Sequence, residues 1–366
     1  MQGKEKSELI VCGNKTMTTA TIQEYEDIRT IRQQWLSLDS IAGERQLPYV
    51  CYTYYQTYEW NEFLYDMILR GMGRCKERML YAVVSKGGAA VAILPMVITR
   101  SSGKVRIPSC RVAGVLNMSC PYSGQELGET MDVISRYLES KSHGSKFSLA
   151  DIPCRTPLAS IIKGMGGHYS ERTSYHVPLC DFSSFDAYLS SLSKNIYKNI
   201  RKSYNHLTSD NRLMQLKVYG SANMPDDSYL RTIWTLYFRR KQAWRGRSAA
   251  GWLAAVGIAV KAWREVRGGC AMQSVRQLPS ARLYVLEIDT QPAAFMIVYK
   301  HRNHLLMPKL AIDSSYSRYS PGILMIMEAV KEWLNEGIVD FDLCRGDERY
   351  KKEVGGINEP LCRIDK

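Results

Sequence analysis

The last third of the chain contains an ordered series of apolar runs that constrains the fold more than any other feature. Residues 283–288 and 293–299 are rich in β-forming residues and are separated by a short turn segment. A third such run, 305–312, comes after a short polar connection, so we predict a three-stranded antiparallel meander. A helix of about four turns and a final strand at 338–343 complete the predicted unit.

The predicted helix has clear start and end signals. Ser320 suits the N-cap, Pro321 the first helical position and Gly337 the C′ position. A helix that begins directly after a strand offers unpaired N–H groups and a positive dipole end, where proteins bind phosphates. We therefore predict that Arg318, Ser320, Pro321 and Gly322 contact a phosphate-bearing donor. The alternatives are ordinary helix-start chemistry and, for Arg318, a solvated loop cation.

Two segments resemble a known family. Ser320-Pro321-Gly322 and the run DLCRGDERYK from Asp342 to Lys351 resemble the GNAT-fold acyltransferases grouped with bacterial cellulose-biosynthesis-type proteins. The same superfamily includes the FemABX-type aminoacyltransferases, which use two such folds in tandem. The resemblance covers about residues 181–356 and departs at Val354-Gly355-Gly356. It implies an α/β (α+β) fold of tandem GNAT-like domains, each a mixed, mostly antiparallel sheet flanked by helices.

The first half of the chain repeats the order of elements of the second half. Residues 80–84 and 89–98 flank a Gly-Gly turn signal and predict a hairpin. A helical segment at about 128–142 and a strand at 146–151 come next, at an offset of roughly 190–200 residues from the second half. We interpret this as a duplication, with coincidence as the alternative, because hairpin, helix and strand often succeed one another.

This interpretation predicts two domains. Residues 1–180 would form an N-terminal, degenerate GNAT-like lobe, since they lack a counterpart of Ser-Pro-Gly and of the Arg-Gly-Asp-Glu run. Residues 181–366 would form the catalytic GNAT-like lobe, with a helical insertion at about 185–270.

The first helix of that insertion carries a basic face. Lys194, Lys198, Arg201 and Lys202 recur at helical spacing, and a second predicted helix at about 227–245 adds five further basic residues. We predict that Lys194 and Arg201 contact the substrate, with a solvated surface as the alternative.

The chain has a formal net charge of +13 and a sequence pI near 9.2. Such a chain attracts polyanions, which here include tRNA, coenzyme A and an anionic lipid surface. No RNP motif, KH loop, zinc knuckle or helix-turn-helix is present in the sequence, which argues against base-specific reading of nucleic acid.

Other features bound the cellular and chemical class. No apolar run reaches the roughly 18 residues of a transmembrane helix, and the first ten residues are too charged for a signal peptide, so we expect a cytoplasmic protein. The ten cysteines and six histidines show no zinc-ligand spacing, and we expect neither a metal site nor disulfides. The sequence also lacks a G-x-S-x-G elbow and a P-loop.

The charged run after the last strand has the groups that acyl transfer to an amine requires. Asp347 or Glu348 would orient or deprotonate the amine, and Tyr350 would protonate the leaving thiolate. Arg345 and Lys351 would pair with these carboxylates or with donor phosphate, and Asp342 would contact the substrate. Pro308, in the strand 305–312, implies a bulge or an unpaired edge near the donor carbonyl. The alternative is a loop held by internal salt bridges.

The resemblance and this run together predict an N-acyltransferase that uses acyl-coenzyme A as co-substrate, binds no permanent cofactor and acts on a small amine-bearing acceptor. The first alternative is an aminoacyl-tRNA-dependent transferase of the FemABX type. The second is a non-catalytic assembly protein of polysaccharide biosynthesis.

Overall fold

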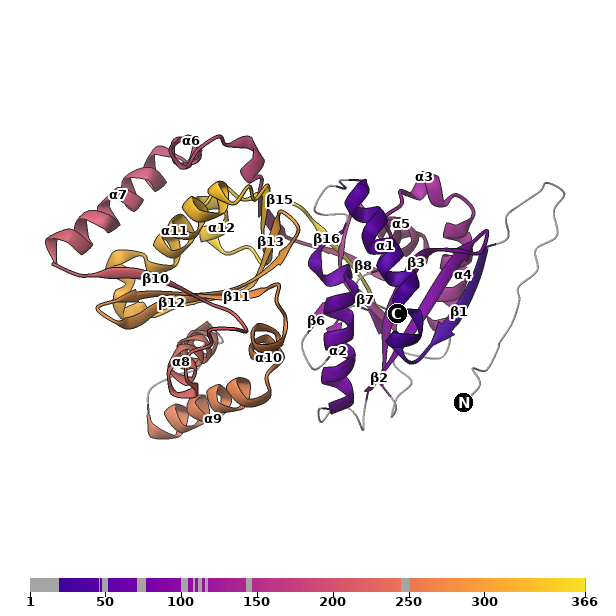
Figure 1. The fold of residues 1–366 in the computed structure, drawn as a ribbon, viewed down its shortest axis with the longest axis horizontal. Helices are drawn as coiled ribbons and strands as arrows, with labels where there is room; N and C mark the ends of the chain where they lie inside the picture. Colours follow the sequence, from indigo (N-terminus) through magenta and orange to yellow (C-terminus); the bar gives the residue numbers. More distant parts are fainter. Residues whose placement is uncertain are drawn as a thin grey trace. The chain divides into compact units, whose positions relative to one another are not determined.

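A computed structural model describes residues 20–45, 47, 52–70, 77–99, 105–107, 109–110, 114–115, 118–142, 147–244 and 251–365 (Figure 1). The chain forms two compact units. Unit 1 comprises residues 1–173 together with 359–366, and unit 2 comprises Ser174–Asn358. The sequence placed the division at 180/181 and assigned the C-terminus to the second lobe. The strands at Ser174–Val177 and Leu361–Asp365 account for the difference, because each pairs within the sheet of the other half.

Unit 1 contains a seven-stranded sheet in the order β1-β2-β3-β4-β7-β16-β8. Its strands are β1 Ala20–Tyr25, β2 Glu77–Lys86, β3 Ala89–Thr99, β4 Val105–Ile107, β7 Phe147–Pro153, β8 His168–Arg172 and β16 Leu361–Asp365, beside a small sheet of β5 Ser109–Cys110 and β6 Gly114–Val115. Its helices are η1 Ile28–Ile31, α1 Arg32–Glu44, η3 Tyr54–Gln56, α2 Tyr58–Arg70, α3 Gly124–Leu127, α4 Thr130–Ser142 and α5 Pro157–Gly164.

Unit 2 contains a second seven-stranded sheet in the order β10-β11-β12-β13-β14-β9-β15. Its strands are β9 Ser174–Val177, β10 Met214–Tyr219, β11 Ala281–Ile288, β12 Gln291–His301, β13 His304–Ile312, β14 Asp340–Arg345 and β15 Ile357–Asn358. Its helices are η5 Leu179–Asp181, α6 Phe185–Ser191, α7 Lys194–Ser209, α8 Asp227–Trp244, α9 Trp252–Gly268, α10 Cys270–Gln277, η6 Ser314–Tyr319, α11 Pro321–Asn335 and α12 Arg349–Glu353.

The predicted meander, helix and final strand of unit 2 are confirmed. β11, β12 and β13 pair antiparallel in sequence order, and α11 connects β13 to the parallel strand β14. The helical insertion is only partly right, because β10 lies within it and pairs with β11. The helix predicted from residue 185 is also interrupted, since Ser193 caps a new helix by accepting a hydrogen bond from the Ile196 N–H.

Helices cover both faces of the sheet of unit 2, with α6, α7 and α11 on one side and α8, α9 and α10 on the other (Figure 1). The apolar stripe of α11 packs on the strands of the meander. Trp333, in the last turn of α11, belongs to this layer: the centre of its ring lies 4.6 Å from that of Phe341, and its indole N–H donates to Tyr284 Oη at 2.9 Å. This packing fixes α11 against the sheet of unit 2.

The two sheets repeat the same pattern of pairing directions. In each, three antiparallel pairs are followed by one parallel pair and then by two antiparallel pairs. The second strand of the parallel pair starts at Phe147 in unit 1 and at Asp340 in unit 2, which is an offset of 340 − 147 = 193 residues. The offset and the shared order match the duplication inferred from the sequence.

The expectation that the cysteines form no disulfide is wrong. Cys154, directly after β7, is bonded to Cys362 of β16 across 208 residues of sequence. The pair forms because β16 returns from the far end of the chain to pair with β7, where Cys362 lies opposite Ile152. Within the ranges that the structure describes, no helix is long and apolar enough to cross a membrane.

Candidate active site

The parallel strands of unit 2 stay paired over a short distance only. His304, Leu305 and Leu306 of β13 lie opposite Asp340, Phe341 and Asp342 of β14, and this pairing stops there although both strands continue. From that point β13 pairs with β12 alone, and β14 with β9. The main-chain groups that face each other beyond Leu306 are therefore not joined in a ladder.

Both strands are irregular where they part. The β12–β13 register shifts between Ile297 and Tyr299, opposite Met307 and Pro308, because proline has no N–H to donate to the ladder. On β14 the register shifts between Asp342 and Cys344. The bulge that Pro308 predicted is thus present in β13, whereas no comparable sequence signal marks the bulge in β14.

Cys344 sets the geometry at the end of β14. Its backbone has a left-handed φ of 60°, and its N–H donates to Asp342 Oδ1 at 2.6 Å. The Met307 N–H of β13 forms a hydrogen bond with the thiol. Burial raises the pKa of Cys344, and the neighbouring Asp342 carboxylate raises it further, so the thiol stays protonated. Asp342, predicted to contact substrate, instead holds the bulge.

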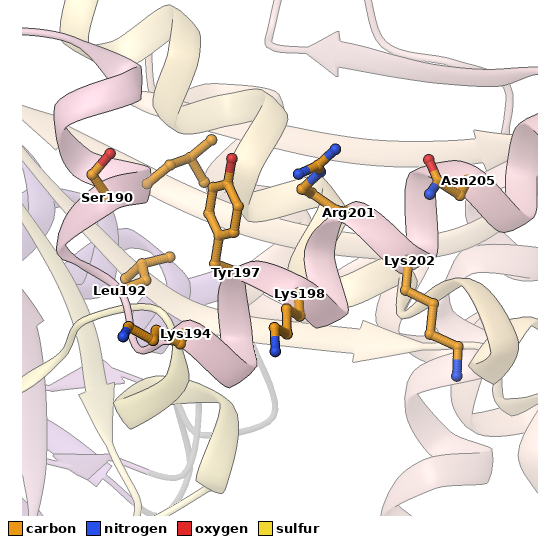
Figure 2. A pocket seen from close by; sticks show the side chains of 9 residues that line it. Ser190, Leu192, Lys194, Tyr197, Lys198, Arg201, Lys202 and Asn205 are labelled. Carbon is orange, nitrogen blue, oxygen red and sulfur yellow. The ribbon is translucent and has the colours of Figure 1, made fainter.

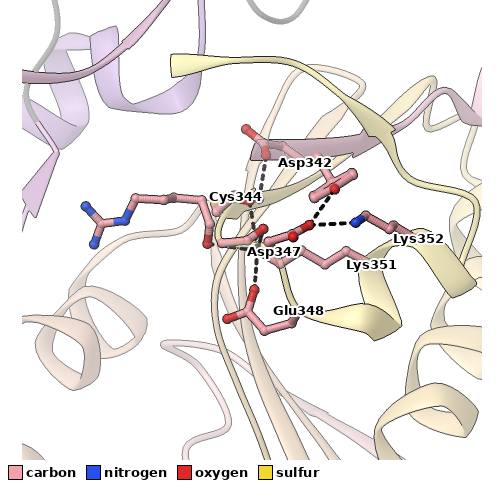
Figure 3. Close-up of polar contacts among 9 residues, drawn as sticks. Asp342, Cys344, Asp347, Glu348, Lys351 and Lys352 are labelled. Atoms are coloured by element: carbon pink, nitrogen blue, oxygen red, sulfur yellow. Dashed lines mark hydrogen bonds and ion pairs between the residues drawn. The ribbon is translucent and has the colours of Figure 1, made fainter. Parts of the chain in front are cut away.

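The loop after β14 is organised around a buried ammonium group. Lys351 is 2% exposed, and its Nζ donates to the carbonyls of Cys344 at 2.9 Å, Arg345 at 2.8 Å and Gly346 at 3.4 Å (Figure 3). It also lies 3.0 Å from Glu348 Oε2. With these partners Lys351 holds the loop closed. Of the two pairings expected from the sequence, with a carboxylate or with donor phosphate, the structure shows the first. Arg345 contributes only its carbonyl to these contacts of Lys351, and Arg345 itself is an exposed residue.

The two candidate carboxylates have different surroundings. Asp347 Oδ1 accepts from Tyr175 Oη at 2.7 Å and lies 2.8 Å from Lys352 Nζ (Figure 3). The hydrogen bonds from Lys352 and then from Tyr175 lower the pKa of Asp347, which keeps it charged and a weak base. Glu348 is 39% exposed and has Lys351 beside one oxygen. Tyr175 comes from β9, so the sequence around the loop did not point to it.

Tyr350 lies half-buried against the core of unit 2. Burial raises the pKa of its phenol, the Glu348 carboxylate raises it further, and Arg240 of α8 acts in the opposite direction. Cys344 is also close enough to raise it. The side chains of Tyr350, Glu348 and Cys344 therefore gather at the end of β14, with Arg240 contributed by a helix more than a hundred residues earlier. The phenol keeps its proton over the ordinary pH range.

The start of α11 differs in detail from the prediction. Ser320 takes a left-handed backbone conformation, φ 49° and ψ 52°, and its hydroxyl makes no capping hydrogen bond, although Pro321 begins the helix as expected. A Cβ added to Gly322 would lie 2.9 Å from Ile312 Cγ2. Gly322 is therefore required for close packing of α11 on β13, which is a different role from the close approach to a pyrophosphate that we expected.

Arg318 is held by the end of α7. Its Nε lies 2.9 Å from Asp210 Oδ2, and Tyr319 Oη donates to the same oxygen at 2.8 Å. A cavity of about 550 Å³ lies against α8 and the start of β12, and the connection between β13 and α11 reaches it at Asp313. Ser315 and Tyr316 of η6 line it together with Arg231 and Arg239 of α8. These two arginines were noted in the sequence only as part of a basic helix.

The basic face of α7 forms one wall of a surface groove of about 610 Å³ (Figure 2). Lys194, Lys198, Arg201 and Lys202 line it, with Tyr197 and Leu192 between them and no acidic residue among its lining. The groove lies along α6 and α7, and no hydrogen bond or ion pair connects Lys194 or Arg201 to the charged loop in the described structure. The substrate contact expected of Lys194 and Arg201 stays a prediction.

Comparison with known proteins agrees with this fold. The family model of the acetyltransferase (GNAT) domain matches residues 194–352, and no curated protein matches the chain. Among solved structures, a tandem GNAT protein from the clavulanic acid biosynthesis pathway covers 95% of this chain and 98% of its own, with a TM-score of 0.54 at 12% identity. FemX covers 89% and 95%, with a TM-score of 0.56 at 8% identity. The chain therefore has a tandem GNAT-like fold, and the match to the acetyltransferase (GNAT) domain lies within its second unit.

Proposed function

We propose that unit 2 transfers an acyl group from acyl-coenzyme A to an amine. The observation that carries this proposal is the short pairing of β13 with β14, which leaves two strands parted beyond Leu306 and Asp342 beside the start of α11. An extended thioester arm can take the place of a neighbouring strand there, because the facing main-chain groups are not used in a ladder. The Pro308 bulge lies at the same level and supports a hydrogen bond to the thioester carbonyl.

The donor phosphates would lie at the connection between β13 and α11. The first turn of α11 supplies a positive dipole end, and the neighbouring cavity supplies the cations Arg231 and Arg239 and the hydroxyl groups of η6. We assign these two arginines rather than Lys351, because its ammonium group is already bound by carbonyl oxygens.

The reaction joins the amine nitrogen to the acyl carbon and breaks the carbon–sulfur bond. The amine loses one proton and the leaving thiolate gains one, so a base and an acid are needed. Glu348 serves as the base in our proposal, because the pKa of Asp347 is lowered by Lys352 and Tyr175 and that carboxylate is better suited to orient an ammonium group. Tyr350 serves as the acid in our proposal, because its phenol keeps its proton over the ordinary pH range and lies beside Glu348 and Cys344 at the end of β14.

The decisive experiment compares two tyrosine variants. Tyr350→Phe should lower kcat by about 10²–10³ and leave donor binding unchanged, in line with loss of a general acid. Tyr204→Phe is the matched control, because Tyr204 is also half-buried with a raised pKa but contacts Glu328 of α11. Steady-state kinetics with acetyl-coenzyme A and a panel of amines measures both. Equal activity of the two variants would remove Tyr350 from the mechanism.

A second candidate function uses aminoacyl-tRNA as the donor. The groove along α7 favours it, because four cations line the groove without an acidic neighbour. Binding of tRNA would then weaken with salt, with a log–log slope of about −0.7 to −0.9 per phosphate contact. Charge reversal of Lys194 and Arg201 would abolish turnover with aminoacyl-tRNA as the donor and spare turnover with acyl-coenzyme A. Turnover with charged tRNA alone would establish this alternative.

The resemblance to cellulose-biosynthesis-type proteins supports an acceptor from polysaccharide or envelope biosynthesis. A non-catalytic assembly role within such a pathway predicts no acyl transfer to any amine and no effect of Tyr350→Phe on growth phenotypes.

A further inference from the structure

The helix α9 of unit 2 has an exposed apolar face that the proposed chemistry does not use. Trp252 and Leu253 are 73% and 72% exposed, and Val256, Val260 and Trp263 are 42–47% exposed. At 3.6 residues per turn these five side chains lie within an arc of about 100°. The opposite side of the helix is buried: Ile258, Ala262 and Val266 are at most 2% exposed, and α9 packs there on α8 and α10.

Basic residues lie on and beside this face: at the same spacing Arg267 falls within the arc, Arg264 about 20° outside it and Lys261 about 80° outside it. Lys261, Arg264 and Arg267 are all exposed, and the guanidinium group of Arg267 lies 4.9 Å from the centre of the Trp263 ring. The only acidic residue of α9, Glu265, is half-buried near the packed side. An exposed apolar stripe beside cations, with a tryptophan at each end about 16 Å apart along the helix, is typical of helices that lie in a membrane interface.

The charges decide which partner fits. A twofold dimer would place this face against its own copy and bring like charges together without an acidic group on the face to pair them. A single helix surface is also convex, which suits a flat partner better than a peptide, and neither of the two cavities described above has a lining residue from α9. A flat, deformable and anionic lipid surface can bury the apolar side chains and pair with the cations at the same time.

We propose that α9 docks the protein on anionic phospholipid membranes, with Trp252, Leu253 and Trp263 inserted at the level of the headgroups and the three basic residues over lipid phosphates. This docking is independent of the acyl-transfer chemistry proposed above, because it uses none of the residues at the end of β14.

The test is sedimentation of the full chain with vesicles of phosphatidylcholine alone or mixed with phosphatidylglycerol. Wild-type protein should partition at least tenfold more strongly onto the mixed vesicles, since each basic residue near an anionic surface favours binding severalfold. The double variant Trp252→Ser/Leu253→Ser should lose at least tenfold in partitioning. Leu213→Ser is the matched control, because Leu213 is 71% exposed outside α9 and should bind like wild type.

Separate results would overturn the proposal. If the double variant sediments as strongly as the control, the vesicles attract only the net charge of the chain. If neither protein sediments and the double variant turns a wild-type dimer into a monomer in light scattering, the face is a contact between copies. A third variant, Lys261→Gln/Arg264→Gln, should weaken the preference for phosphatidylglycerol severalfold while Arg267 keeps part of it, and an unchanged preference would contradict the role of the charges.

Discussion

Lys351 provides the sharpest test of how the candidate active-site loop is built. Its buried ammonium group makes two short hydrogen bonds, to the carbonyls of Cys344 and Arg345, a longer one to Gly346, and an ion pair with Glu348. In Lys351→Met the side chain stays unbranched and is one heavy atom shorter, and the carbonyls lose their donor. Breaking a buried charged interaction typically costs about 3–5 kcal/mol, and the part-exposed Glu348 adds little to this.

The expected loss should appear first in the loop. Native-state hydrogen exchange of the amides that come after Cys344 should accelerate by about 10² to 5 × 10³-fold, because local opening becomes easier by that free energy. Urea denaturation monitored by tryptophan fluorescence gives the accompanying change in the free energy of unfolding of the whole chain. The matched control is Lys352→Met, since Lys352 is 57% exposed and pairs only at the surface with Asp347. If both variants exchange alike, the buried ammonium group does not hold the loop.

Local geometry supports three further predictions. Gly322→Val should destabilise unit 2 by about 1–3 kcal/mol in urea denaturation, and adding Ile312→Ala should recover part of this, because the new side chain meets Ile312. Hydrogen bonds from the Ser123 backbone and then from Arg45 lower the pKa of Glu126 to about 2. The Glu126 carboxylate therefore stabilises the folded chain above pH 4.5, and this contribution is lost as the pH falls toward 2. Glu126→Gln should flatten that part of an acid titration followed by circular dichroism. Burial lowers the pKa of His301 from 6.5 to about 4, so the unfolded chain takes up the proton first and stability should fall as the pH drops between those values; His301→Gln should remove this dependence in urea titrations across that range.

The elements of unit 2 were predictable because their signals are local. Alternating apolar runs set β11 to β13, and Pro321 and Gly337 mark the ends of α11 within two residues. The interruption between α6 and α7 was missed because the apolar spacing continues through Leu192, whereas the capping hydroxyl of Ser193 ends one helix and begins another. β10 was missed because its flanks are helical.

The sequence located the candidate site but did not assign a role to each of its side chains. The charged run after β14 was identified, but seven charged or phenolic side chains in ten positions cannot all face a substrate. Which of them turn inward depends on distant partners: Tyr175 of β9 holds Asp347, and Arg240 of α8 lies near Tyr350. The left-handed backbone at Cys344 brings three carbonyls round Lys351. No sequence spacing encodes these contacts, since they depend on the order of strands in the sheet.

The repeated architecture explains why the chemistry is proposed for one unit only. In unit 1, β7 starts a three-residue parallel pairing at Phe147 and has a left-handed residue, Asp151, at its fifth position; in unit 2, β14 does the same from Asp340 with Cys344. The backbone at the end of the two strands is therefore equivalent. The next segments differ, because the chain after β7 goes into the disulfide at Cys154, while the chain after β14 forms the charged loop. A covalent link to β16 stabilises a strand end without presenting an acid or a base to a ligand, so unit 1 keeps the frame of the site and unit 2 keeps its reactive groups.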